Sequence, residues 1–367
     1  MAPDCRALIA ERIRQRGPVT VAEFMDLALY APEVGYYARA AQRSGRAGDF
    51  FTSVDVGPVF GTLLAERFAE FWLELGGGNR PPARFDLVEA ASGNGRLSRD
   101  ILDAAALRHP AFYDAISAHL VERSAEARAH HPAVLASHLP RLASSGDALP
   151  DRIDGILFAN ELLDAFPVHL VEMREASLRE IYVDLEAERL VERPGPPSSP
   201  ALAAYLAEAG VTLADGARAE LNLAAMEWVA SAATRLRRGF LVLIDYGYEA
   251  AELYSVARAR GTLATYHRHL VDAPGSDAGP AWLADPGGRD LTSHVDFTSV
   301  RRAAERAGLE TVSIAPQTRF LLDVLEGSPL VAEFSAPDRL ADRLSLKTLL
   351  MPGGLGSTHT VMVFAKR

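Results

Sequence analysis

The chain of 367 residues contains a single cysteine, Cys5, so it can form neither an internal disulfide nor a cysteine-rich zinc site. No apolar run approaches the roughly 20 residues of a membrane-spanning helix. The N-terminus has no apolar signal-peptide core, and its acidic residues Asp4 and Glu11 argue against a transit peptide. The sequence therefore predicts a protein of the reducing cytoplasm without a membrane span.

Positive charge is also scarce, since the formal net charge is −10. General binding of nucleic acid needs a basic surface that contacts phosphates, so we expect no nucleic-acid partner. Neither the Gly-x-Ser-x-Gly motif of hydrolases nor the lysine loop of P-loop proteins occurs. His267 and His269 lack clustered metal-ligand partners, and we expect them to be solvated loop residues and the protein to have no metal site.

Apolar segments of two kinds alternate from Phe85 onward, short strand-like runs and longer helix-like patterns. This alternation predicts an α/β fold with a parallel sheet and helices on both faces. The predicted strands cover residues 85–89, 118–122, 153–158 and 240–245, and the predicted helices cover 95–106, 124–137, 217–237 and 298–307.

The remaining segments predict an extension and two insertions. Residues 1–80 form an N-terminal helical and loop extension, with helices in 5–30 that break at Gly17-Pro18 and another helix at 59–75, and 81–367 form the core. Period-two runs in 167–193 predict a small antiparallel ribbon within an insertion of about 167–215. A second insertion spans 263–290, and a strand at 360–364 ends the chain. Long insertions in α/β folds are often lids or substrate-binding elements.

Residues Phe85 to Leu97 read Phe-Asp-Leu-Val-Glu-Ala-Ala-Ser-Gly-Asn-Gly-Arg-Leu. A buried strand that ends near Glu89 is followed by small residues, then by Gly93 and Gly95, then by the start of a helix. A nucleotide-like ligand can rest on the bare backbone of such a loop at a helix N-terminus. Many glycine turns bind no ligand, however, so this motif indicates a binding site only in combination with the residues that follow it.

Two further acidic residues follow predicted strands at the same edge of the sheet. Glu122 could accept both hydroxyls of a ribose, or could be a surface carboxylate at a strand end. Asp147, after Gly146, is placed to meet an adenine edge, although Gly-Asp is also common turn chemistry.

The segment Phe158-Ala-Asn-Glu-Leu-Leu-Asp-Ala-Phe-Pro167 carries three polar side chains after a buried strand. If a helical turn begins at Asn160, Glu161 and Asp164 share one face and could grip a guanidinium or an ammonium group. Alternatively, Asn160 only caps a helix whose positive end the two carboxylates favour. Asp245-Tyr246 ends another buried strand, and Gly247 permits a sharp turn there.

Taken together, these segments resemble the MidA family of class I S-adenosylmethionine-dependent methyltransferases, which includes a mitochondrial complex I assembly factor that methylates a protein arginine. The matching motifs run through nearly the whole chain: Leu29-Tyr30-Ala-Pro-Glu-Val-Gly-Tyr-Tyr37, Gly48-Asp-Phe-Phe-Thr-Ser53, Val59-Phe-Gly61, Leu87-Val-Glu89, Val121-Glu-Arg-Ser124, Ala159-Asn-Glu-Leu-Leu-Asp-Ala165, Ile244-Asp-Tyr-Gly247, Asp290-Leu-Thr-Ser-His-Val-Asp-Phe297 and Gln317-Thr-Arg-Phe-Leu321.

The resemblance implies a Rossmann-like fold, S-adenosyl-L-methionine as cofactor and methyl transfer to a protein arginine. It implies that Asn160, Glu161 and Asp164 are catalytic, and that the N-terminal extension reaches over the cofactor. The implied cofactor-binding residues are Asp49, Thr52, Glu89, Ala91, Gly93, Gly95, Leu97, Glu122, Arg123, Asp147, Ala159 and Asn160.

One residue departs from the family pattern, because Ala91 stands where the family's loop has its first glycine. Its methyl group penalises a positive φ, so cofactor affinity could be weakened or the loop shifted. Three alternatives therefore stay open: a small-molecule methyltransferase, an assembly or binding protein that has lost catalysis, and, more distantly, a nicotinamide dehydrogenase. The expected partner is a protein with an exposed arginine, such as a respiratory-complex subunit, and the sequence leaves a homodimer open.

Overall fold

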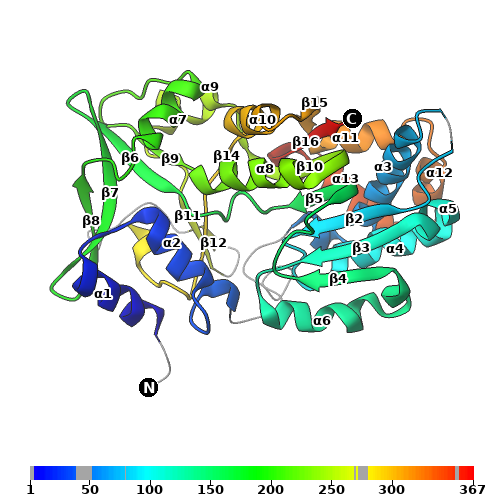
Figure 1. Cartoon of the computed structure of the whole chain (residues 1–367), viewed down its shortest axis with the longest axis horizontal. Coiled ribbons are helices and arrows are strands. Elements are labelled where there is room, and N and C mark those ends of the chain that lie inside the picture. Colours follow the sequence, from blue (N-terminus) through cyan, green and yellow to red (C-terminus); the bar gives the residue numbers. More distant parts are fainter. Residues whose placement is uncertain (1–3, 39–51, 79, 268–269, 272–279, 352–354) are drawn as a thin grey trace.

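A central sheet organises the computed structural model, which describes residues 4–38, 52–78, 80–267, 270–271, 280–351 and 355–367. The strand order is β15-β16-β10-β5-β2-β3-β4, with β14 beside the end of β10 (Figure 1). β16 runs antiparallel to both of its neighbours, β10 and β15, and the other strand pairs in the described part of this sheet are parallel. The strands are β2 (Phe85–Ala90), β3 (Ile116–Val121), β4 (Leu142–Gly146), β5 (Ile153–Asn160), β10 (Leu236–Tyr248), β14 (Val295–Asp296), β15 (Glu310–Pro316) and β16 (His359–Lys366).

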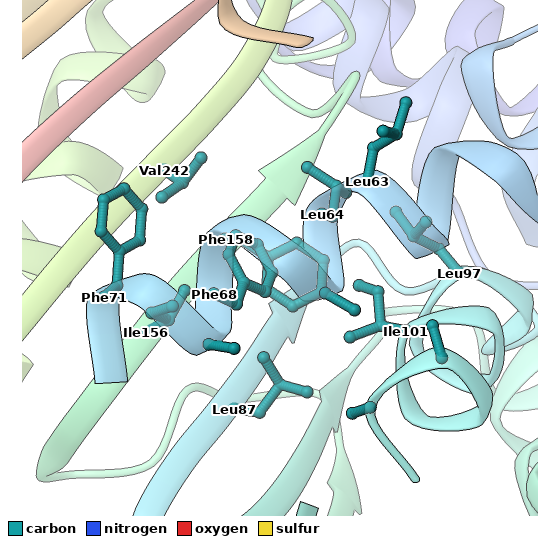
Figure 2. Packing of buried hydrophobic residues seen from close by; sticks show 14 of the residues in the cluster. Leu63, Leu64, Phe68, Phe71, Leu87, Leu97, Ile101, Ile156, Phe158 and Val242 are labelled. Carbon is teal, nitrogen blue, oxygen red and sulfur yellow. The ribbon is translucent and has the colours of Figure 1, made fainter. Parts of the chain in front are cut away.

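Helices cover both faces of this sheet, as predicted. On one face, α3 (Val59–Leu75) and α4 (Arg96–Arg108) pack on alternate residues of the strands, and Phe68 lies 5.2 Å from Phe158 between ring centroids (Figure 2). On the other face, α8 (Leu223–Arg235) and α10 (Phe297–Arg306) cover the intervening residues, which include Val88 and Leu243. The strands are therefore buried on both sides, which is typical of a parallel sheet.

A second sheet forms from the first insertion and lies at the left of Figure 1. It has the order β1-β7-β6-β9, with β8 paired to β7. Its strands are β1 (Val19–Thr20), β6 (His169–Arg174), β7 (Ser177–Glu186), β8 (Arg189–Gly195) and β9 (Arg218–Leu221). The predicted ribbon at 167–193 is confirmed as the antiparallel strands β6, β7 and β8.

The first two helices, α1 (Cys5–Arg16) and α2 (Val21–Tyr30), break at Gly17-Pro18 as predicted and share an apolar core with this second sheet. Phe24 of α2 packs edge-on against Trp282 at 5.4 Å between ring centroids. The N-terminal helices and both insertions therefore pack together, whereas α3 belongs to the core of the central sheet. The domain boundary near residue 80 stays a prediction.

The second insertion contributes a small third sheet, β11 (Ala264–His267), β12 (Leu270–Val271) and β13 (Asp290–Thr292). His269 lies outside the described residues. The remaining elements are α5 (Pro110–Ala115), α6 (Ala125–Leu135), α7 (Ala201–Ala209), α9 (Ala250–Leu253), α11 (Gln317–Leu325), α12 (Leu330–Ser335), α13 (Leu340–Leu350) and α14 (Leu355–Thr358), with 3-10 turns at Tyr36–Ala38, Ser53–Val56, Ala136–Arg141, Val256–Arg258 and Ala281–Leu283. Within the described ranges, none of the helices combines the length and the apolar character needed to cross a membrane.

The structure corrects one predicted helix and adds strands that were not predicted, among them β4 and β15 of the central sheet. Residues 218–221 of the predicted helix 217–237 form β9, because Ala219 and Leu221 are buried where they pair with β6. The helix begins after Asn222, whose side chain caps it by accepting from the Ala225 N–H. Sequence reasoning missed β4 and β15, whose polar and half-exposed residues do not form an apolar run.

Candidate functional site

The glycine loop forms a tight turn at the carboxyl edge of the central sheet. Ala91, directly after β2, adopts a left-handed conformation with φ 55°, so the chain keeps the glycine-like geometry despite the methyl group. The Gly95 N–H then donates to Ser92 O at 2.8 Å. Gly95 itself has φ 85°, and a Cβ there would lie 2.8 Å from the Leu120 side chain. Glycine is therefore required at residue 95, and α4 begins immediately after it.

Glu122 lies beside this loop at the end of β3. Its Oε2 accepts from the Gly93 N–H at 2.9 Å and its Oε1 from the Ser124 N–H at 2.8 Å. Burial raises the pKa of this carboxyl, although these backbone bonds oppose the effect. A carboxylate can accept about four hydrogen bonds. The lone pairs that remain could accept from a ribose hydroxyl.

Glu89 points away from the open side of the loop. It is buried in β2 and accepts from the backbone N–H of Ser98, at 3.2 Å, and from the Ser98 hydroxyl. Burial raises the pKa of Glu89 to about 8. Since Ser98 lies in the first turn of α4, Glu89 fixes the start of that helix and hence the loop before it.

His131 of α6 holds the glycine loop in place, a role that sequence reasoning missed. Its Nε2 donates to Gly93 O at 2.8 Å, and its Nδ1 accepts from the Ser145 hydroxyl at 2.8 Å. Burial lowers the pKa of this imidazole, which keeps it neutral. No local pattern indicates this role, since the adjacent His130 of the same helix is exposed and the two histidines cannot be told apart from the sequence.

Four of the other proposed cofactor residues contact other parts of the protein, and three of these four are buried. Thr52 is buried and bonds Asp55, which in turn pairs with Arg96 at the start of α4. Leu97 is a core residue of α4, and Ala159 is buried within β5. Arg123 lies over the Tyr30 ring, with its Cζ atom 4.5 Å from the ring centroid.

Asp147 and Asp49 are two further residues that the resemblance implies for cofactor binding. Asp147 is exposed in the turn after β4, and the Gly146 carbonyl before it accepts from the Glu122 N–H at 2.8 Å. This hydrogen bond places Asp147 close to the end of β3, which Glu122 follows. Asp49 lies outside the described residues.

A cavity of about 670 Å³ opens next to the end of β5. Strands β10, β15 and β16, the end of the second insertion and the N-terminal segment all contribute to its walls. Its lining residues are Tyr37, Glu161, Asp164, Tyr246, Gly247, Tyr248, Glu249, Glu252, Asp290, Thr292, His294, Phe297, Ile314, Ala315, Pro316, Ser357, Thr358, His359 and Thr360.

The segment after β5 brings Glu161 and Asp164 to this cavity, but not through the helical turn considered above. Glu161 has φ 51°, and its N–H donates to Ile244 O of β10 at 2.8 Å, so the chain leaves the sheet in a left-handed bend. Asn160 caps no helix there, since its Nδ2 donates to Glu161 Oε1 at 3.1 Å. A left-handed glutamate costs about 1–3 kcal/mol and is a feature of functional sites.

Several parts of the fold hold the backbone of this segment. The Leu163 N–H donates to Asp245 Oδ2 at 2.8 Å, and the Leu163 carbonyl accepts from Asn222 Nδ2 at 3.0 Å. The next two carbonyls accept from the Ser293 N–H, at 3.0 Å, and from the Tyr30 hydroxyl, at 2.8 Å. The two carboxylates are therefore preorganised by β10, α8, the 290–297 segment and α2.

Asp164 has one satisfied and one unsatisfied oxygen. Oδ2 accepts from the Tyr246 hydroxyl, while Oδ1 is buried and has no hydrogen-bond partner. Burial raises the pKa of Asp164 to about 7, and the nearby charge of Glu161 adds to this effect. A buried acceptor without a donor costs about 1–3 kcal/mol. A ligand that brings an N–H group to Oδ1 would recover that free energy.

The cavity is acidic. Glu161, Asp164 and Asp290 line its inner part, and none of its described lining residues is a lysine or an arginine. Burial lowers the pKa of the lining residue His294 to about 4, so that ring is neutral at pH 7. Tyr37 of the N-terminal segment donates to Asp290 Oδ1 at 3.0 Å and closes one side. This arrangement favours a cationic ligand.

Comparison with known sequences connects this geometry to a reaction. Residues 63–315 match the model of a family described as "Putative S-adenosyl-L-methionine-dependent methyltransferase". Among curated relatives, the mitochondrial protein arginine methyltransferase NDUFAF7 of Mus musculus is 28% identical over 85% of this chain and 74% of its own length. The Homo sapiens protein of the same name is 29% identical over 80% of this chain and 67% of its own length.

A solved structure resembles the whole chain. It is a superfamily member from Burkholderia thailandensis bound to S-adenosyl-homocysteine, with a TM-score of 0.84 and 29% sequence identity. The match covers 99% of this chain and 92% of that chain. The fold predicted from the sequence is therefore confirmed.

Proposed function

Because this chain belongs to the family of S-adenosyl-L-methionine-dependent methyltransferases, we propose that its methyl acceptor is an arginine side chain of a protein. Three curated relatives that are 28–29% identical to this chain over the aligned residues are named protein arginine methyltransferases. The acidic cavity beside the end of β5 supports the same acceptor, since a guanidinium carries one positive charge and five N–H donors.

The observation that carries this proposal is the buried, unpartnered Oδ1 of Asp164 in the wall of the cavity. A guanidinium that donates to Asp164 Oδ1 and to Glu161 would satisfy this acceptor and compensate one of the two negative charges. An uncharged acceptor molecule would leave at least one buried charge without compensation.

The residues of the chain divide into two functional groups. The loop from Ala91 to Gly95 and the carboxylate of Glu122 would hold the cofactor, which supplies an electrophilic methyl group when bound. Glu161 and Asp164 would hold the guanidinium in a fixed plane and favour loss of its proton. Asn160 would orient Glu161 through the 3.1 Å hydrogen bond between them.

The partner and the compartment remain predictions. A respiratory-complex subunit and a homodimer rest on the family resemblance and on the sequence alone. The curated relatives are named mitochondrial, whereas the sequence of this chain predicts the cytoplasm.

The test is transfer of a labelled methyl group from the cofactor to arginine-containing proteins, with methylarginine identified after acid hydrolysis. We expect Glu161→Gln and Asp164→Asn each to lower the rate by about 100-fold or more, while S-adenosyl-homocysteine still binds. Glu180→Gln is the matched control, since Glu180 is a buried carboxylate of β7 that pairs with His169 away from the cavity. Label that appears only in a small extractable product, or full activity in both cavity variants, would contradict the proposal.

A further inference from the structure

His359 lies at the start of β16, in the wall of the cavity and next to Glu161. Its Nε2 is 3.4 Å from Glu161 Oε1, and its Nδ1 is 2.9 Å from the Thr358 hydroxyl oxygen. The ring is buried and stands edge-on to Tyr246 at 5.6 Å between centroids. Sequence reasoning assigned no role to this histidine.

Charge balance shows that arginine methylation must release a proton. The guanidinium and its methylated product each carry one positive charge, and the methyl donor changes from a cation to a neutral thioether. One N–C bond forms, one S–C bond breaks, and one proton leaves the guanidinium nitrogen. A carboxylate that holds the guanidinium is the first group within reach of that proton.

A carboxyl group has an ordinary pKa near 4.3 and an imidazole one near 6.5. A proton received by a glutamate beside a neutral histidine therefore moves favourably to the ring nitrogen, and the carboxylate is regenerated. If His359 Nδ1–H donates to Thr358 Oγ1, Nε2 is the basic nitrogen and faces Glu161.

We propose that His359 accepts, through Glu161, the proton that the substrate guanidinium loses on methylation. This role rests on the proposed arginine methylation, and His359 acts through Glu161 rather than on the substrate. Among the described residues, Asp164 and Tyr246 are further titratable groups near it, and His294 also packs against the Tyr246 ring.

The first test is the pH dependence of kcat/KM for arginine methylation in the wild type and in His359→Gln. Asp164 and His359 must both be deprotonated for turnover, so the logarithm of the wild-type value should fall with a slope of about 2 at low pH. The variant should lose about tenfold in kcat with KM little changed, and its slope should fall to about 1. Glutamine keeps a hydrogen-bonding side chain, so a merely structural role would not alter the slope.

The matched control is His138→Gln, because His138 is also buried and hydrogen-bonded but contacts Asp103 and Tyr113 outside the cavity. Its pH profile should equal that of the wild type. A His359→Gln variant with unchanged kcat and slope would overturn the role of His359 while leaving arginine methylation intact.

A second measurement does not depend on activity. The pKa of His359 is followed by NMR of its ring proton, assigned by comparison with His359→Gln. We expect Glu161→Gln to lower that pKa, because the variant removes the adjacent negative charge. An unchanged pKa would overturn the coupling, whether or not the protein methylates arginine. A lowered pKa in a protein that methylates no arginine would instead confirm the coupling of the two groups and overturn the proposed function.

Discussion

Asp245 fixes the backbone of Leu163, which immediately precedes Asp164: Oδ2 of Asp245 accepts the Leu163 N–H at 2.8 Å. The other oxygen of Asp245 accepts the N–H of Tyr246, whose hydroxyl donates to Asp164. One buried carboxylate in β10 therefore sets the positions of the segment that carries Asp164 and of the tyrosine that binds it. This contact links the central sheet directly to the proposed chemistry.

We expect Asp245→Asn to lower kcat by about tenfold or more, since the amide cannot accept from both backbone N–H groups and Asp164 would shift. The change should leave S-adenosyl-homocysteine affinity intact, because Glu122 and the glycine loop are elsewhere on the sheet edge. Steady-state kinetics and calorimetry measure the two effects. Asp86→Asn is the control, because Asp86 also accepts a backbone N–H, that of Asp154, but at the opposite end of the sheet.

Ala91 adopts φ 55°, which disfavours an L-residue by roughly 1–2 kcal/mol. Ala91→Gly should therefore stabilise the fold by a few tenths to about 1 kcal/mol, since the greater chain entropy of glycine offsets part of the gain. Removal of the methyl also opens the loop, so S-adenosyl-homocysteine should bind about threefold tighter. Ala136→Gly, at φ 39° between α6 and the turn after it, should stabilise without changing affinity. Weaker binding by Ala91→Gly would show that the methyl group contacts the cofactor.

Asp164 should make the fold less stable as pH rises. Its folded-state pKa of about 7 lies above the ordinary 3.8, so the folded state binds more protons than the unfolded state between these values, and stability falls as pH rises through this window. Asp164→Asn should therefore unfold at a higher denaturant concentration than the wild type at pH 8. The free energy of unfolding should rise by about 1–4 kcal/mol, because a tenfold change in proton affinity equals about 1.4 kcal/mol. The difference should disappear near pH 4.

Asp86 should make the fold more stable as pH rises, which is the opposite of the effect expected for Asp164, and so it serves as the comparison. Burial opposes its ionisation, but hydrogen bonds from His119 and from the Asp154 N–H outweigh burial and lower its pKa. Its contribution to stability is therefore present above the unfolded-state pKa and is lost as pH falls. Asp86→Asn should destabilise the protein at pH 8, and equal behaviour of the two variants would refute the assignment of Asp164.

Glu122 and Arg123 are neighbours with different expected roles in cofactor binding. Glu122→Gln should weaken S-adenosyl-homocysteine binding by about tenfold or more, because an amide cannot accept from the ribose hydroxyls and from two backbone N–H groups together. Arg123→Ala should change affinity little, since its guanidinium lies over Tyr30 and pairs with Asp26 at 3.2 Å. Calorimetric titration of both variants measures this contrast.

Local chemistry made much of this architecture predictable. The apolar runs of β2, β5 and β10 and the helical pattern of α3 follow from periodicity, because a strand buried on both faces is mostly apolar. The small residues from Ala91 to Gly95 indicated a positive-φ turn, and Ala91 retains that conformation. The sequence also predicted that Glu122, Glu161 and Asp164 lie at one edge of the sheet, since parallel strands end on the same side.

Other features depend on contacts between distant residues, which no local pattern encodes. His359 and Glu161 are almost 200 positions apart, and only the pairing of β16 with β10 and of β10 with β5 brings them within 3.4 Å. The left-handed bend at Glu161 likewise depends on a hydrogen bond to Ile244 of another strand. The sequence by itself determined the principal buried strands, the glycine loop and the polar side chains that follow these strands, because these features depend on local periodicity and turn chemistry. The tertiary structure decided which oxygens stay unpartnered, because burial and hydrogen-bond geometry depend on the whole fold.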